Sequence, residues 1–205
     1  MDKFDYKLNN YIKPYQDKLL RPLVYVLTKL RLSAVAITYF SLLLMLSYLF
    51  FIKKNSYWAL LFLLLALFFD IVDGSLARYQ GNNSDRGKFI DMFNDIIIFA
   101  LFVWGLIYGG YLSGLTGMTL ASTLIISKVL RIAYFSAILK SDWHFKAFAG
   151  FTPNSLVYLC YFAFFLLVLS GLNLLSEFGI IISVFLFLDI FLYYLKIISP
   201  ARKNH

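Results

Sequence analysis

Long apolar stretches separated by short polar breaks fill the chain from residue 33 to residue 198. Each stretch is close to the roughly 20 apolar residues that a helix needs to cross the hydrocarbon core of a bilayer. The breaks contain Gly, Asn and Ser, which are typical of the points where helices stop. The pattern predicts six transmembrane helices, at 33–52, 56–79, 85–109, 115–139, 154–171 and 177–198.

The first 31 residues have a different pattern. Lys and Arg alternate there with Phe, Tyr and Leu, and no uninterrupted apolar run occurs. Such a mixture is typical of a helix that lies in the plane of the membrane interface. We therefore expect an amphipathic interfacial segment over 1–31, broken into pieces at Pro14 and Pro22. The membrane domain is expected over 32–199, with a short cytoplasmic tail at 200–205.

The composition agrees with this fold class. Of the 205 residues, 61% are hydrophobic and 15% are charged, whereas a soluble domain has about 45–50% apolar and about 25% charged residues. The chain is therefore predicted to be an all-α integral membrane protein. Its single cysteine, Cys160, lies inside an apolar stretch and has no partner for an internal disulfide.

The distribution of positive charge predicts the orientation in the membrane. Lys and Arg accumulate on the cytoplasmic side of transmembrane helices. With the N-terminus inside, 17 of the 19 Lys and Arg residues fall on the cytoplasmic side, and Lys53 and Lys54 fall outside. We expect a multi-pass protein of the cell membrane, or of the inner membrane if the source is prokaryotic. The net charge of +8 does not indicate nucleic-acid binding, which needs a contiguous basic face on a soluble domain.

Four carboxylates interrupt the apolar pattern, at Asp70, Asp73, Asp91 and Asp95. Residues spaced by three or four share one face of a helix, and a tight turn joins the two helices. The four groups are therefore expected to meet just below the cytoplasmic surface. Because anions repel strongly in a low dielectric, cations are expected among them. Carboxylates without His or Cys suit Mg²⁺, Mn²⁺ or Ca²⁺ rather than zinc.

Small and basic residues accompany the carboxylates. Gly74 and Ala77 share the stripe of Asp70 and Asp73, and small residues let a ligand approach the backbone. Arg78 follows one turn after Gly74, and its guanidinium suits phosphate. Taken alone, Arg78 could be an interfacial charge and Gly74 a packing residue; together they predict a metal site that receives a diphosphate from the cytosol. The role of Asp189 stays open between a structural hydrogen bond and a site lining.

The stretch from residue 70 to residue 95 resembles the signature of the CDP-alcohol phosphotransferase family. The matching positions, at the family's spacing, are Asp70, Asp73, Gly74, Ala77, Arg78, Gly87, Asp91 and Asp95. Six spans preceded by a surface helix are also similar to that family. The resemblance implies that a substituted phosphate is moved from a CDP-linked donor to an alcohol with release of CMP, with two divalent cations, Mg²⁺ or Mn²⁺, in the site. It also implies a homodimer.

The resemblance further implies roles for individual residues. Asp70, Asp73 and Asp91 would be metal ligands, and Asp95 would be the general base and a further metal contact. The residues expected to line the CDP pocket are Gly74, Ala77, Arg78, Ser84 and Gly87. Thr38 is a further candidate, although the family's Pro-Asn ahead of this Thr is replaced by Ala-Val in this chain. Arg131 is the candidate for an anionic acceptor.

The expected function belongs to phospholipid biosynthesis. The phosphatidyl group of CDP-diacylglycerol would pass to a polar hydroxyl acceptor such as serine, inositol, inositol phosphate or glycerol phosphate. Residues 131–135 and 148–154 are loosely similar to segments of the phosphatidylserine synthase branch. One alternative reverses the partners, with a CDP-aminoalcohol donor and a diacylglycerol acceptor. Another is a divalent-cation channel or transporter, since acidic residues inside the membrane also suit ion paths. The clustering of the acidic residues near one face of the membrane argues against this alternative.

Overall fold

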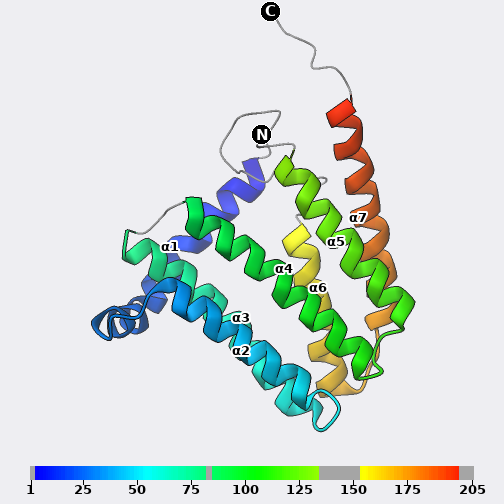
Figure 1. Cartoon of the computed structure of the whole chain (residues 1–205), viewed down its shortest axis with the longest axis horizontal. Coiled ribbons are helices and arrows are strands. Elements are labelled where there is room, and N and C mark those ends of the chain that lie inside the picture. The colour runs from blue at the N-terminus through cyan, green and yellow to red at the C-terminus, as the bar shows by residue number, and fades with distance from the viewer. Residues whose placement is uncertain (1–2, 82–84, 134–152, 199–205) are drawn as a thin grey trace, which may run out of the picture. The chain divides into compact units, whose positions relative to one another are not determined.

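The computed structural model of the chain is helical throughout the part that it describes (Figure 1). The backbone is described for residues 3–81, 85–133 and 153–198, and the side chains for residues 14–81, 90, 93–130, 156–195, 197 and 198. Over these ranges there are seven helices and no strand. The prediction of an all-α chain is therefore confirmed for the described residues.

The helices begin close to the predicted positions. Their bounds are α1 Lys3–Lys29, α2 Ala34–Phe51, α3 Ser56–Tyr79, α4 Asp85–Tyr108, α5 Gly114–Ala133, α6 Pro153–Ser170 and α7 Leu175–Ile198. The helices α2 to α7 begin within two residues of the six predicted spans, and α3 has the predicted bounds. The predicted end of the fifth span, at residue 139, lies outside the described residues.

Capping explains where several helices begin and end. The Ser33 hydroxyl accepts the amide of Ala36 at 3.2 Å in front of α2, and Asn55 Oδ1 accepts two amides in front of α3. These side chains satisfy amides that have no partner inside the helix. After α3, α4 and α6 the chain turns at Gly81, Gly110 and Gly171, whose φ angles of 68°, 78° and 74° are strained for other residues.

Three helices are long and apolar enough to cross a membrane: α2, α3, and α7 over Leu175–Leu195. The described parts of the other three contain shorter apolar segments, at Phe93–Tyr108, Gly114–Leu130 and Leu156–Ser170. Each of these segments is bounded at one end by residues whose side chains lie outside the described part. The predicted count of six spans therefore stays a prediction.

The prediction that Pro14 and Pro22 break the N-terminal segment is wrong. One helix, α1, runs through both prolines. Proline has no N–H, so the carbonyls four residues earlier lose their helical donor. Packing offsets this cost, because Leu20, Val24 and Leu27 of α1 are buried in one apolar cluster with residues of α2 and α3.

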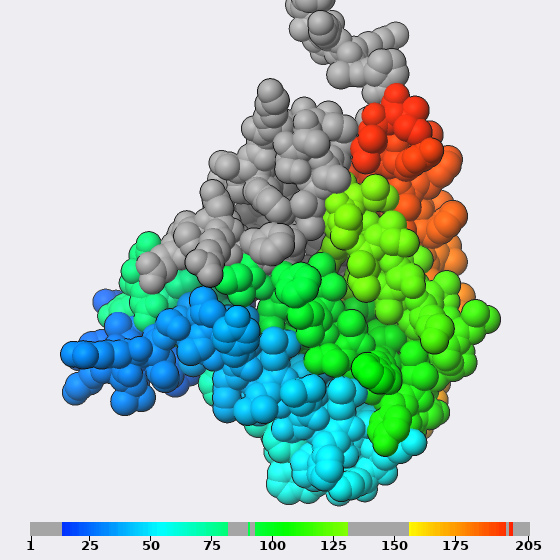
Figure 2. Space-filling model, viewed as in Figure 1, coloured from blue at the N-terminus to red at the C-terminus, as the bar shows by residue number. Residues whose placement is uncertain are grey.

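Residues 3–110 form the first of two compact units. Here α2 packs against both α3 and α4, and α1 packs across the C-terminal half of α3 (Figure 1). The side chains of α1 meet the last turns of α3 in Figure 2, where blue atoms adjoin green-cyan ones. One face of α2 therefore supplies the centre of this unit, with Met45 and Tyr48 fully buried.

The second unit begins at Tyr111 and contains α5, α6 and α7. Its main pairing is between α5 and α7, and α6 packs against α7. Gly179 of α7 lies so close to Thr116 that a Cβ atom added there would be 3.1 Å from its Cγ2. The small residue thus allows the close approach of these two helices.

Candidate active site

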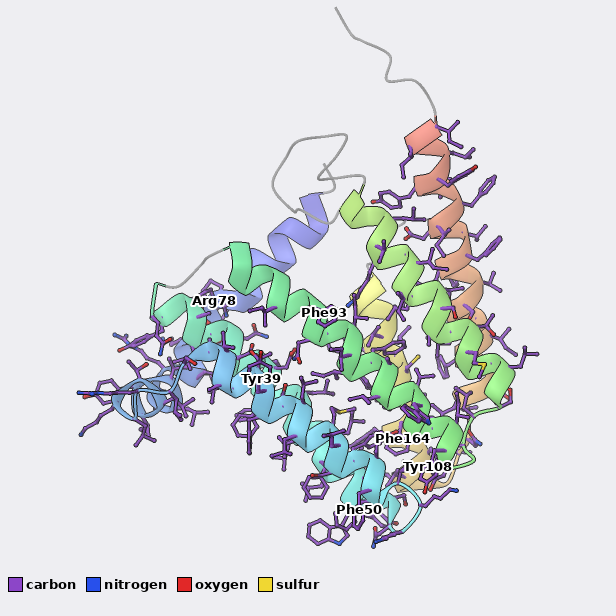
Figure 3. All side chains as sticks on the ribbon, viewed as in Figure 1. Tyr39, Phe50, Arg78, Phe93, Tyr108 and Phe164 are labelled. Carbon is purple, nitrogen blue, oxygen red and sulfur yellow. The ribbon has the colours of Figure 1, made fainter. Side chains whose placement is uncertain are left out.

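A buried polar cluster lies among the three helices α2, α3 and α4. Its members with at most 5% of their surface exposed are Thr38, Ser41, Asp73 and Asn94. All of these residues lie toward the end of the unit at which α3 ends and α4 begins. Figure 3 labels Tyr39 and Phe93, the chain neighbours of Thr38 and Asn94, toward the end where Arg78 lies and away from Phe50 and Tyr108.

Asp73 is held by a hydroxyl from the neighbouring helix. Thr38 Oγ1 donates to Asp73 Oδ2 at 2.6 Å, and it also lies 3.1 Å from the backbone oxygen of Ala34. Asp73 is only 3% exposed, and a buried carboxylate needs partners for its oxygens. Two sequence-predicted site residues, Thr38 and Asp73, are therefore brought together.

Asp70 lies one turn before Asp73 and is linked to α4. Asn94 Nδ2 is 3.4 Å from Asp70 Oδ1 and 3.4 Å from Ser41 Oγ. Both distances are long for a hydrogen bond, so each contact is weak. Through this amide, polar groups of all three helices are nevertheless connected at one level of the bundle.

Asp95 follows Asn94 in α4 and is half-buried. The backbone of Asp91 lies one turn earlier in the same helix, but its side chain is outside the described part, as is all of Ser84. Among the described side chains, no three acidic, His or Cys residues are close enough to hold one metal ion together. The predicted convergence of four carboxylates therefore stays a prediction.

Gly74 and Ala77 are half-buried and continue the stripe of α3 that Asp70 and Asp73 begin. A Cβ atom at Gly74 would be 3.4 Å from Arg78 Nη1, an ordinary van der Waals distance. Packing alone therefore does not require glycine at this position. Gly87, the last predicted small residue, lies in the first turn of α4.

Arg78 is engaged by the N-terminal helix. Its Nε donates to Asp17 Oδ2 at 3.0 Å and its Nη2 to Asp17 Oδ1 at 2.7 Å, so the pair is bidentate. Nη2 also donates to Ser75 Oγ at 3.1 Å. Since the two side chains are 33% and 38% exposed, we expect this pair to contribute only about 0.2–1 kcal/mol to stability.

A basic pocket of about 350 Å³ opens around this ion pair, between α1 and α3. It is lined by Asp17, Lys18, Arg21, Val24, Ser75, Arg78 and Tyr79. Three cationic side chains face one carboxylate there, so the pocket has a positive balance. Of the residues predicted for the site, Arg78 is among those that line this pocket, and α1 supplies the other two cationic side chains.

The second unit contains a separate polar contact. Ser127 Oγ of α5 donates to Asp189 Oδ2 of α7 at 2.6 Å, and both residues are buried. Lys128, the next residue after Ser127 in the chain, is only 4% exposed. The open question about Asp189 is thereby answered in part, because it makes a hydrogen bond between helices. Arg131 lies one turn further along α5, and its side chain is outside the described part.

Four residues of this region were missed by the sequence reasoning: Asp17, Ser41, Ser75 and Asn94. The sequence pattern contained a signal for two of these residues. Ser41 follows Thr38 by one turn on the same face of an apolar helix, and Asn94 is a polar residue directly before Asp95. For Asp17 no local signal exists, because its partner lies 61 residues away in the sequence.

Two comparisons with known proteins bear on the family of this chain. A match of 35% identity over 125 residues links the chain to an uncharacterized protein of Aquifex aeolicus (strain VF5), covering 58% of this chain and 62% of that relative. The chain thus matches less than two thirds of the relative's length. The family model for CDP-alcohol phosphatidyltransferase matches residues 31–194, most of the chain. This range includes the carboxylates of α3 and α4, and the chain belongs to the CDP-alcohol phosphatidyltransferase family.

Proposed function

We propose that this protein transfers the phosphatidyl group of CDP-diacylglycerol to the hydroxyl group of a small polar alcohol and releases CMP. The observation that carries the proposal is the buried cluster at the C-terminal end of α3, in which acidic residues of the family motif meet polar residues of α2 and α4. Family membership supplies the reaction class. The proposal also includes six membrane spans, a cytoplasmic active site and a homodimer.

Two carboxylates of the described cluster support a divalent cation in the site. Asp70 and Asp73 offer carboxylate oxygens, and Asp73 is buried between apolar helices, where an uncompensated negative charge is costly. Oxygen ligands of this type suit Mg²⁺ or Mn²⁺. Asp70, Asp73, Asp91 and Asp95 would hold two such ions. When bound, the ions would neutralise the diphosphate and stabilise negative charge on the departing CMP.

Asp95 would act as the general base. Its carboxylate removes the proton from the acceptor hydroxyl, and the acceptor oxygen forms a bond to the phosphorus that carries diacylglycerol. The bond from this phosphorus to the oxygen of CMP breaks, and CMP leaves with its negative charge. A base must lie within hydrogen-bond reach of the hydroxyl that it activates, and positioning together with electrostatics does most of the work in such transfers.

The remaining residues would place the donor. Gly74, Ala77, Gly87 and Ser84 would line the cytidine side of the site, and Thr38 would fix Asp73 through the 2.6 Å hydrogen bond. The Arg78 guanidinium, oriented by Asp17, would face the diphosphate with its remaining N–H groups. Arg131 would bind an acidic acceptor headgroup.

The proposal is tested with the purified full chain, CDP-diacylglycerol labelled in its lipid part, and Mg²⁺ or Mn²⁺. Serine, inositol, inositol phosphate and glycerol phosphate are supplied as acceptors in parallel, and the lipid products are separated on one plate. We expect one acceptor to give a new labelled lipid and an equal amount of CMP. A parallel reaction contains a CDP-aminoalcohol and labelled diacylglycerol.

The two donor arms separate the alternatives. A labelled product only with the CDP-aminoalcohol would show that donor and acceptor are reversed, and the proposed substrate would be wrong. No product in either arm would contradict the transferase proposal for these substrates.

A further inference from the structure

Asn94 is a buried polar residue that neither the family motif nor the proposed mechanism uses. It lies in α4 directly before Asp95, and 3% of its surface is exposed. Its side-chain amide nitrogen reaches toward α2 at Ser41 and toward α3 at Asp70. A carboxamide at this depth has four hydrogen-bonding sites to satisfy, two donors and two acceptors.

The neighbours of Asn94 determine which way its amide points. The hydroxyl of Ser41 donates to the backbone oxygen of Thr38 at 2.7 Å, so its oxygen is left to accept from Asn94. The carboxylate of Asp70 accepts as well. Both neighbours therefore require the NH₂ group of Asn94, and the opposite orientation would place an acceptor against two acceptors.

This orientation leaves the amide oxygen without a donor. Among the residues that the structure describes, Asn94 Oδ1 is buried and has no hydrogen-bond partner. Buried polar atoms are rarely left unpaired, so an exception needs an explanation, and a bound ion or water is one such explanation. The oxygen belongs to the same amide whose nitrogen contacts Asp70, and Asp95 is the next residue along the chain.

We propose that Asn94 is an additional oxygen ligand of the divalent cation, bound directly or through one water molecule, and that its NH₂ group holds Asp70 in position. The inference rests on the proposed metal-dependent function. Amide carbonyl oxygens are ordinary ligands of hard cations. Groups that orient a metal ligand usually affect metal affinity by about 10- to 100-fold.

A purely structural role for Asn94 predicts something different. An amide that only joins three helices affects the stability of the protein equally with and without metal. An ion that binds only the folded state raises the melting temperature. Replacing a ligand of that ion therefore reduces the rise in melting temperature that the metal causes. The difference between the melting temperatures with and without metal therefore separates the structural role from the ligand role.

The test measures Mn²⁺ binding to the purified full chain by the disappearance of the free-ion EPR signal, together with melting temperatures with and without Mn²⁺. The variants Asn94→Leu and Asn94→Ala remove the oxygen. Ser183→Ala is the control, since it removes a half-buried hydroxyl that donates to the Gly179 carbonyl within α7 and that has no role in the proposed metal site.

We expect about 10-fold or weaker Mn²⁺ binding in Asn94→Leu and Asn94→Ala, with most of the Mn²⁺-induced rise in melting temperature lost. Ser183→Ala should bind Mn²⁺ within about threefold of the wild type. Wild-type affinity in whichever of the two oxygen-removing variants folds, or an unchanged Mn²⁺-induced rise, would overturn the inference.

A parallel Asp70→Asn variant separates this inference from the proposed function. If Asp70→Asn loses Mn²⁺ while the Asn94 variants retain it, the role of Asn94 is wrong and the metal site stands. If the wild type binds no Mn²⁺, both the inference and the proposed cofactor fail, whereas release of CMP by the wild type tests the transferase reaction independently.

Discussion

Asp95 is the residue on which the proposed proton transfer depends. Replacing it by Asn keeps the size of the side chain but removes the carboxylate that accepts the proton. We expect Asp95→Asn to lower kcat by about 10²- to 10⁴-fold, while donor binding is retained. Steady-state release of CMP and binding of labelled donor check this pair of expectations.

The matched control is Glu177→Gln, which makes the same chemical change at an exposed carboxylate in the first turn of α7. It should retain wild-type kcat. Full activity of Asp95→Asn would refute the assignment of the base, and loss of activity in both variants would indicate a non-specific effect.

Thr38 tests whether the contact between α2 and α3 matters for the metal site. Thr38→Val keeps the shape of the side chain and removes the hydroxyl that donates to Asp73 at 2.6 Å. We expect Mn²⁺ affinity to fall by about 10-fold, because Asp73 loses the group that orients it. The control Thr28→Val removes a hydroxyl that bonds Val24 within its own helix α1. Equal Mn²⁺ affinities in the two variants would show that Thr38 has no such role.

Spacing in the sequence predicted that Asp70 and Asp73 share a face of one helix, and α3 places them there. The pairing of Thr38 with Asp73 required the tertiary structure, since 35 residues separate them. The same reason applies to Ser41 and Asn94. Periodicity identifies a polar residue on a helix but does not identify the residue that faces it on the next helix.

The contact of α2 with α4 depends on a glycine. A Cβ atom at Gly105 would lie 2.3 Å from Cε1 of Tyr48, a fully buried ring whose hydroxyl donates to the Phe102 carbonyl at 3.0 Å. We expect Gly105→Ala to destabilise the protein by about 1–3 kcal/mol through overpacking, measured as a lower melting temperature in detergent. Gly114→Ala, where a Cβ atom meets nothing within 4 Å, is the control. An unchanged melting temperature of Gly105→Ala would contradict this packing.

Arg78 lies at the contact of α1 with α3, and two variants at this contact test its role. Arg78→Ala removes both the ion pair with Asp17 and any contact with the donor, whereas Asp17→Asn weakens the ion pair and leaves the guanidinium in place. If Arg78 binds the diphosphate, KM for CDP-diacylglycerol should rise about 10-fold or more in Arg78→Ala and much less in Asp17→Asn. Equal changes in KM would show that Arg78 only attaches α1 to α3.

Local sequence determines most helix boundaries, because caps and glycines act within a few residues. Asn55 before α3 and Gly81 after it are examples. The continuity of α1 through Pro14 and Pro22 was mispredicted for the opposite reason. It depends on burial of Leu20, Val24 and Leu27 against other helices, which propensity alone does not contain.

At the scale of the whole molecule, the proposed reaction class rests on one motif of α3 and α4 and on the family that the chain belongs to. The acceptor alcohol does not follow from it, because the motif ends at Asp95 and the roles proposed for its residues are binding of the nucleotide and the metal and removal of the proton. Arg131 and the buried contact of Ser127 with Asp189 lie in the second unit. The acceptor preference is to be measured with the panel of acceptors.

The most direct measurement is the release of CMP from CDP-diacylglycerol by the purified chain, before and after removal of divalent cations with EDTA. With a productive acceptor, we predict that CMP and new lipid form in equal amounts, that EDTA stops both, and that added Mg²⁺ or Mn²⁺ restores both. Release of CMP that continues unchanged in EDTA, or no release with any acceptor, would contradict the proposal that the aspartates of α3 and α4 bind the cations for this transfer.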